Sequence, residues 1–353
     1  MSLEYSDLEK FLKRVAIGGI PLGCLLLGVL YYCLFVRPNL AGDLSQLGKI
    51  PMDVGYGARM YDPVFPDQMT RRYDRGDTLA RVVTIGDSFS QQMPNGFQNF
   101  LGHLLGEPVS NVTIDGTRMR PEQGASDLLM SGFFDSHPGV EWVVIESVER
   151  SLVEVWSKVD VGRDPGFVPI LHAGMADAAT PAAQESLGRY FSQGLDWLKL
   201  TVGIDNNPVC RVRLSRPVFT TTAGEDILYF YEQDLWQLSA TEGELSTVVE
   251  RLKALHGLYA ARGIKMLFMP APDKYELYQH LAVDSPYPAR ELGAQLSAAL
   301  DTLDFVVNPL PELRRRLDNG EKDLFMADDT HWSAKGASTA AALLYGRLKE
   351  DHK

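Results

Sequence analysis

A serine and a histidine near opposite ends of the sequence have neighbours suited to acyl transfer. Ser88 lies in "VVTIGDSFSQQ", where a hydrophobic strand is followed by an acid and then the hydroxyl. A serine becomes a strong nucleophile only when a nearby base removes its proton. His331 in "MADDTHWSAKGA" can be that base, and Asp328 or Asp329 can orient its imidazole and stabilise the cation. The pattern predicts a serine–histidine–aspartate triad.

The elements around Ser88 predict where such a triad would lie. Continuous apolar strands alternate with helical segments, which indicates a parallel sheet with helices on both faces. Ligands of open parallel sheets bind beyond the carboxyl ends of the strands, where Ser88 is expected and where its own N–H can donate to an oxyanion. Predicted strands are 81–86, 109–116, 141–147, 226–235, 264–270 and 304–307; predicted helices are 95–106, 180–203, 246–261, 288–300 and 333–350.

Residues 15–36, "VAIGGIPLGCLLLGVLYYCLFV", carry no charge and are long enough to cross a bilayer core as a helix. The run ends in "FVRPNL", a poor cleavage site, which favours an uncleaved anchor over a signal peptide. Lys10, Lys13 and Arg14 precede the span, so the positive-inside rule places the N-terminus in the cytoplasm. We expect a single-pass protein of the inner (cytoplasmic) membrane whose catalytic domain is periplasmic.

The anchor divides the chain into parts of different composition. Residues rich in glycine, proline and aspartate follow it before the strand–helix alternation begins, and one later stretch does not alternate simply. The predicted parts are a cytoplasmic tail (1–14), an anchor (15–36), a stalk or lead-in (37–76) and a catalytic domain (77–353) with an insertion at about 151–245.

Composition argues against several other functions. The formal net charge of -12 opposes nucleic-acid binding, which needs basic surface to displace counterions. Only Cys210 lies outside the apolar N-terminal run, so no disulfide is expected within the catalytic domain. No cysteine pair or histidine cluster has zinc-ligand spacing, and we expect neither a metal nor a cofactor.

An early Gly-Asp-Ser and a late Asp-Asp-Thr-His resemble the SGNH (GDSL) hydrolase superfamily. "DTHW" (329–332) is similar to the alginate-type polysaccharide O-acetyltransferases and the related DHHW proteins, as are "VVIESVERSL" (143–152) and "MPAPDKYELY" (269–278). The resemblance implies a three-layer, flavodoxin-like α/β fold behind the anchor. In the alginate-type enzymes the Asp-x-His segment precedes the serine, whereas here it follows; a circular permutation of the sheet would reconcile the two orders.

The resemblance also implies roles for individual residues. The Asp-Thr-His-Trp match favours Asp329 as the orienting acid, with Asp328 as the alternative that ordinary SGNH spacing selects. Gly116 in "IDGT" matches the glycine of the second SGNH block, a candidate for the oxyanion site, although the usual Gly-x-Asn-Asp block is absent. Arg150 is either a helper of the oxyanion or part of a structural ion pair with Glu146 or Glu149. Lys274 and Tyr275 are candidates to line the site, with a turn after the fourth strand as the alternative. Trp332 is a candidate sugar platform, with a packing role as the alternative.

The implied reaction moves an acetyl group through an acyl-serine to a hydroxyl of an exopolysaccharide or cell-wall glycan. An exported domain has no acetyl-CoA on its own side, so the resemblance implies a partner from the MBOAT family of membrane acyltransferases. The alternatives are a membrane-anchored SGNH esterase or deacetylase, a non-catalytic assembly protein of a polysaccharide-modifying complex, and an acyl-handling protein of the D-alanine transfer type. The triad itself does not distinguish transferase from hydrolase.

Overall fold

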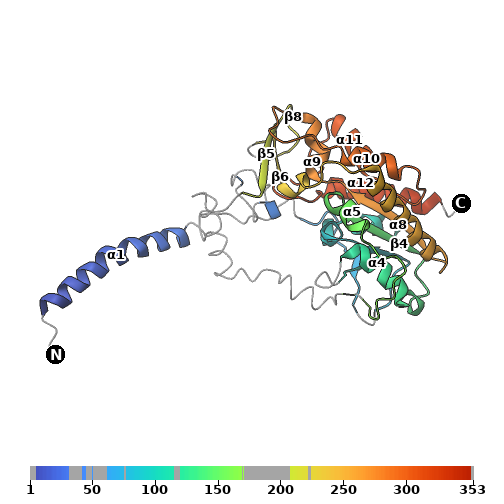
Figure 1. The fold of residues 1–353 in the computed structure, drawn as a ribbon, viewed down its shortest axis with the longest axis horizontal. Helices are drawn as coiled ribbons and strands as arrows, with labels where there is room; N and C mark the ends of the chain where they lie inside the picture. The colour runs from blue at the N-terminus through green and yellow to red at the C-terminus, as the bar shows by residue number, and fades with distance from the viewer. Residues whose placement is uncertain are drawn as a thin grey trace.

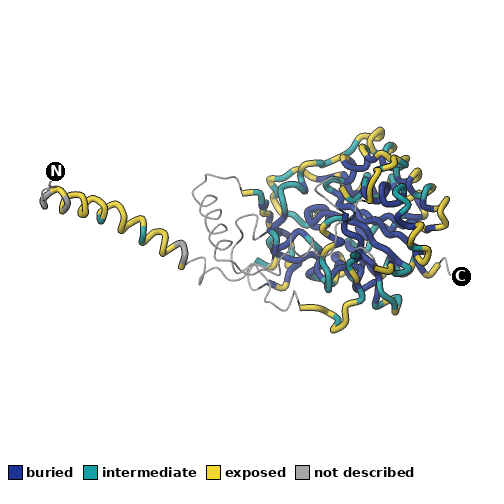
Figure 2. Tube along the Cα trace, turned by 90° about the horizontal axis from the view of Figure 1, so that it is seen from below, coloured by how far each residue is buried: buried dark blue, intermediate teal, exposed yellow. Residues whose placement is uncertain are grey.

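The computed structural model describes residues 5–31, 42–44, 50, 62–74, 77–114, 120–168, 170, 207–221 and 224–350. Helix α1 (Tyr5–Tyr31) contains the stretch Glu9–Gly28, which is long and apolar enough to cross a membrane and has none of its surface buried by the rest of the chain. Figure 2 shows α1 exposed along its length. An anchor and a signal sequence both fit this helix, and the last part of the predicted span lies outside the described residues.

A five-stranded sheet in the order β1-β3-β2-β4-β7 forms the centre of the domain, and each neighbouring pair is parallel. Val306 adds a parallel bridge to β7, where the sequence predicts a full strand over 304–307. From β3 to this bridge the strands follow the flavodoxin-like order, whose switch point lies between β2 and β4. The strands are β1 (Thr70–Arg72), β2 (Val82–Ile85), β3 (Val109–Val112), β4 (Trp142–Val148) and β7 (Lys265–Ala271).

Two separate hydrophobic cores cover the two faces of the sheet. Alternate residues of a strand point to opposite faces, so Val82 and Val144 join one core while Val83 and Val143 join the other. The three-layer α/β fold expected from the sequence is therefore confirmed (Figure 1). Helices α3 (Phe97–Leu105) and α12 (Ala334–Glu350) pack on the first face; α4 (Pro121–Met130), α5 (Glu149–Trp156), α8 (Glu242–Ala260) and α10 (Leu292–Leu300) pack on the second.

A small antiparallel sheet, β6-β5-β8, lies beside the main one. Its central strand comes from the stretch that the sequence predicts as an insertion at about 151–245; the limits of that insertion stay a prediction.

Predicted helix 180–203 lies outside the described residues, and α8 begins earlier than predicted because Thr241 and Glu244 form a capping box. The remaining elements are β5 (Val209–Leu214), β6 (Ile227–Tyr231), β8 (Ala282–Val283), α9 (Lys274–Tyr278), α11 (Leu310–Asp318) and the 3₁₀ helices η3 (Ser88–Gln91), η4 (Met93–Asn95), η5 (Phe133–Ser136), η6 (Glu232–Leu235) and η7 (Gln279–Leu281).

The turn after β2 requires a glycine at position 86. A Cβ there would lie 2.2 Å from the Ser90 hydroxyl and 2.4 Å from Glu146 Oε2. We expect Gly86→Ala to lower the free energy of unfolding by about 1–3 kcal/mol, as overpacking does. Denaturant unfolding of the full chain in detergent measures this. Gly257→Ala in α8, where a Cβ meets nothing within 4 Å, is the control and should stabilise by up to about 1 kcal/mol. Equal stability of the two variants would contradict the crowding.

Candidate active site

Ser88 is the first residue of η3, directly beyond the carboxyl end of β2, and its side chain is exposed. Asp87 holds this turn in place through both of its carboxylate oxygens. Oδ1 accepts the Phe89 N–H at 3.1 Å, and Oδ2 accepts the Val148 N–H at 2.8 Å, which ties the turn to the end of β4. The aspartate of Gly-Asp-Ser is therefore a structural cap that fixes the serine at the edge of the sheet.

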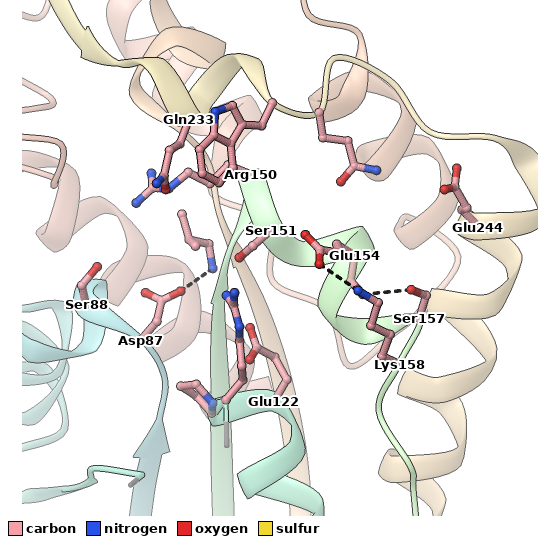
Figure 3. Close-up of a pocket in the computed structure, with 15 residues that line it drawn as sticks. Asp87, Ser88, Glu122, Arg150, Ser151, Glu154, Ser157, Lys158, Gln233 and Glu244 are labelled. Carbon is pink, nitrogen blue, oxygen red and sulfur yellow. Dashed lines mark hydrogen bonds and ion pairs between the residues drawn. The ribbon is translucent and has the colours of Figure 1, made fainter. Parts of the chain in front are cut away.

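A pocket of about 650 Å³ opens between the ends of β2 and β4. Asp87 and Ser88 lie on one side of it and Arg150 and Ser151 on the other (Figure 3). Its position coincides with the switch point of the strand order, where doubly wound sheets bind their ligands. The pocket thus extends from the candidate nucleophile across the carboxyl edge of the sheet.

His331 forms the second half of the site, and its partner is Asp329. Nδ1 of the imidazole lies 2.6 Å from Asp329 Oδ1, which also accepts the His331 backbone N–H at 2.9 Å. Asp328 is buried and forms no described bond to the imidazole. The geometry therefore selects Asp329 over Asp328. With Nδ1 engaged, Nε2 is the ring nitrogen left for proton transfer, and it has no hydrogen-bond partner among the described residues.

The two halves of the site pack directly against each other. The Phe89 ring, one residue after Ser88, lies 4.9 Å from the His331 ring and 4.9 Å from the Trp332 ring, measured between centroids. Gln92 Nε2 donates to the Trp332 carbonyl at 2.8 Å. These contacts join η3 to the loop before α12, so segments about 240 residues apart in the chain meet at one edge of the sheet.

Asp43, in the segment between α1 and the sheet, is a residue that sequence reasoning missed. Its carboxylate accepts the Thr330 N–H at 2.7 Å and the Thr330 hydroxyl, and its own N–H donates to Asp329 Oδ2 at 2.9 Å. Oδ2 also lies 3.5 Å from His331 Nδ1. Gly42 permits this docking, since a Cβ there would lie 2.1 Å from the Asp328 carbonyl oxygen. The lead-in to the domain thus supplies a second carboxylate to the histidine.

These charges set the proton affinity of the imidazole. Burial alone would lower the pKa of His331, but the hydrogen bond and charge of Asp329 outweigh it. The charge of Asp43 raises the pKa of His331 further, while the charge of Arg150 opposes both. The net effect is a pKa above the ordinary histidine value. For Asp329, burial raises the pKa, yet the interactions with His331 leave it below its usual range.

Arg150 is held by carboxylates other than those predicted. Nη1 lies 2.7 Å from Asp273 Oδ1 and 3.4 Å from Asp234 Oδ1, and neither Glu146 nor Glu149 is its partner in the described structure. The predicted ion pair is therefore wrong in its partners. Asp234 lies after β6 and Asp273 lies after β7. No sequence spacing links either residue to Arg150, so only the folded chain shows that they are its partners. The guanidinium still borders the pocket that contains Ser88.

Three predicted substrate contacts are buried. Lys274 lies under the loop that precedes α12 and contains His331 (326–333, the histidine loop). Its Nζ donates to the carbonyls of Ala327 at 2.8 Å and Asp329 at 3.0 Å. Tyr275 is stacked on Phe230 in the core. Trp332 is fully buried, so its indole offers no surface to a sugar. The packing alternative fits Trp332. Lys274 and Tyr275 lie in helix α9 instead of the turn that was the alternative for them, and Lys274 reaches the site only by supporting the loop. Gly116 lies outside the described residues.

Asp43, Asp329 and His331 also form a group whose ligand atoms lie within 4.8 Å of one another, close enough to hold a metal ion. The hydrogen bonds already made within this group are those of an oriented histidine. Asp329 Oδ1 is hydrogen-bonded to His331 Nδ1. One Asp43 oxygen accepts the Thr330 N–H, and the other accepts the Thr330 hydroxyl. The Asp329 carboxylate is thus bound to His331, and the Asp43 carboxylate is bound to Thr330.

Comparison with known proteins identifies similar sequences for part of the chain. Residues 222–353 match the family model of the SGNH hydrolase-like domain of the acetyltransferase AlgX. The match includes the histidine loop and leaves out Ser88. A probable alginate O-acetylase AlgJ of Pseudomonas aeruginosa is 33% identical over 98 residues, which cover 26% of this chain and 24% of the relative. The matched segment thus spans about a quarter of that relative, and the resemblance to the SGNH-like, alginate-type O-acetyltransferases is confirmed.

Asp43 should influence the acid side of the pH profile. A base must be unprotonated, so activity is lost as the pH falls through the raised pKa of His331. Asp43→Asn removes a charge that raises this pKa, and we expect the acid limb of kcat/KM to move to lower pH. Ester hydrolysis measured across pH tests this. Asp301→Asn, at the exposed end of α10, is the control. An unmoved acid limb in Asp43→Asn would contradict the electrostatic role.

Proposed function

We propose that this protein is a membrane-anchored, extracytoplasmic O-acetyltransferase that carries an acetyl group on Ser88 and delivers it to a hydroxyl of an exopolysaccharide or cell-wall glycan. The observation that carries the proposal is the Asp329–His331 pair at 2.6 Å, packed through Phe89 against the turn that exposes Ser88. The likeness to acetyltransferases of alginate supports acetyl as the acyl group and a polysaccharide as the acceptor.

In the first half-reaction, His331 Nε2 takes the proton of Ser88 while Oγ attacks the carbonyl carbon of an acetyl ester or thioester. The tetrahedral intermediate collapses, the leaving group receives that proton, and acetyl-Ser88 remains. In the second half, Nε2 takes the proton of an acceptor hydroxyl whose oxygen attacks the acetyl carbon. Ser88 Oγ then leaves and regains its proton. Asp329 keeps Nδ1 as the donor and stabilises each imidazolium.

Two groups on the pocket wall suit the developing oxyanion. No hydrogen bond from the Ser88 backbone N–H is found among the described residues; the Asp87 carboxylate accepts the next N–H, that of Phe89. Arg150 adds a positive charge, and its carboxylate partners hold it beside the pocket. A preorganised cation and N–H in such a site stabilise charge that develops in the transition state.

The acetyl donor must come from the membrane side. The exposed helix α1 fits an anchor in the inner membrane, and we propose a periplasmic catalytic domain that receives acetyl groups from a multi-pass acyltransferase of the MBOAT type. A tether of this kind raises the effective concentration of the serine near such a partner. The contact of Asp43 with the histidine loop places the lead-in chain beside the site.

Ser88→Ala and His331→Ala should each lower hydrolysis of a chromogenic acetyl ester by at least about 1000-fold, because the two act as a unit. Mass spectrometry of the wild-type protein after a short incubation should find an acetyl group on the peptide that contains Ser88. Ser246→Ala, on the exposed surface of α8, is the matched control and should behave as wild type.

The acceptor distinguishes the remaining alternatives. Acetylated oligosaccharide formed in excess over free acetate supports the transferase, whereas acetate alone indicates an esterase. An alanyl group on Ser88 would assign the protein to D-alanine transfer instead. If Ser88→Ala cells retain full acetylation of their polysaccharide, the protein has a non-catalytic role in assembly.

A further inference from the structure

The pocket at Ser88 continues away from the triad as a groove along α5. Beyond Arg150 and Ser151 it is bordered by Ser157 of the α5 cap, and Trp236 and Gln237 also line it. Figure 3 shows Ser88 at one end, Ser157 towards the other and Gln233 above Arg150. A volume of about 650 Å³ lies in the range of pockets that bind small organic ligands.

Trp236 is the most exposed large apolar side chain in the described part of the chain outside α1, at 70%. Its backbone is nevertheless firmly held. Asp234, two residues before it, binds Arg150 and accepts the Tyr275 N–H at 3.2 Å. Arg290 donates to the Gln237 carbonyl at 3.1 Å. The fold thus presents the indole at the rim of the groove instead of burying it. A rigid, exposed aromatic face is suited to stacking on the apolar face of a sugar ring.

Two buried oxygen atoms of the groove residues lack a hydrogen-bond partner in the described structure. They are Glu122 Oε2 and Gln237 Oε1. Glu122 is only 2% exposed, and its other oxygen already accepts the Ser147 hydroxyl at 2.7 Å. Buried polar atoms require partners. A sugar hydroxyl both donates and accepts, so it can pair with the Glu122 carboxyl in either protonation state.

The charges of the groove disfavour an anionic ligand. Lys158 is paired with Glu154 at 2.8 Å, and Arg150 with Asp273. Arg120 is the groove cation that forms no ion pair in the described structure. The groove residues carry four carboxyl groups against three cations, and the chain has a net charge of -12. A polyuronate brings one negative charge with each ring, and the groove has no excess of positive charge to balance a series of them.

We propose that this groove is the acceptor subsite and that it binds a neutral glycan, with one ring stacked on Trp236 and hydroxyls paired with Glu122 and Gln237. This inference rests on the proposed function, because the groove begins at Ser88. It differs from what the relative's name states, since alginate is a polyanion. A glycan so placed presents a hydroxyl to acetyl-Ser88 from the side that Arg150 borders.

Binding can be measured without turnover in a Ser88→Ala background, with the full chain in detergent. The probes are cellotetraose and the N-acetylglucosamine tetrasaccharide as neutral glycans, and a mannuronate tetrasaccharide as the anionic one. By calorimetry we expect at least one neutral probe to bind about tenfold more tightly than the mannuronate. Raising the salt concentration should leave the affinity for the neutral probes unchanged, because these probes carry no charge that salt could screen.

The Trp236 contact is tested in the same background. Trp236→Ala should weaken neutral binding by about tenfold, and Trp236→Phe should restore most of it, because the aromatic face remains. Leu104→Ala, another exposed apolar side chain, on α3, is the control. Thermal unfolding checks that each variant is folded. Tighter binding of mannuronate, or neutral binding unaffected in a folded Trp236→Ala variant, would overturn the inference.

This experiment separates the subsite from the proposed reaction. If wild-type protein fails to hydrolyse acetyl esters while the neutral glycan still binds through Trp236, the proposed function fails and the glycan subsite stands. If esters are hydrolysed through Ser88 but neither neutral probe binds, the reaction stands and the subsite is wrong.

Discussion

The hydrogen bond between Asp329 and His331 is the interaction on which the candidate site depends. Both residues are largely buried, where a charge without a partner is costly. The loop therefore satisfies its polar groups from two directions. Lys274 donates to carbonyls from below, and Asp43 binds Thr330 from the lead-in segment. With Nδ1 engaged by Asp329, Nε2 is the ring nitrogen that remains for proton transfer.

A buried acid, Glu146, fixes the turn that carries Ser88. Glu146 is fully buried and accepts both the Asp87 N–H and the Ser90 hydroxyl through Oε2. Burial, reinforced by the nearby charge of Asp87, raises its pKa well above the usual value. The close approach of Glu146 explains why position 86 has no room for a side chain. The nucleophile turn is thus held by hydrogen bonds to β4, and its position follows the register of β2 against that strand.

The network around Arg150 joins the site to the groove. Asp273, after β7, accepts from Arg150 of α5 at 2.7 Å and from Arg290, before α10, at 2.7 Å. One carboxylate thus holds two cations. Arg290 in turn holds the backbone beside Trp236. Removing one partner of a buried ion pair leaves a charge without compensation, which is strongly destabilising. Here the same bonds hold Arg150 and the backbone beside Trp236, so two residues that line the pocket at Ser88 share one network.

The sequence alone determined the alternation of strands and helices, the apolar N-terminal helix, and the identities of Ser88 and His331 as a candidate pair. These follow from local patterns, since apolar periodicity predicts elements and a strand-to-helix turn predicts an exposed hydroxyl. Only the tertiary structure decided between Asp328 and Asp329, because both are close enough in sequence and the choice depends on backbone direction in a buried loop. It also decided the partners of Arg150, the buried positions of Lys274 and Trp332, and the contact of Asp43, which lies 286 residues from Asp329. Such contacts leave no local pattern, because side chains that meet across the carboxyl edge of a sheet are brought together by strand order and loop packing.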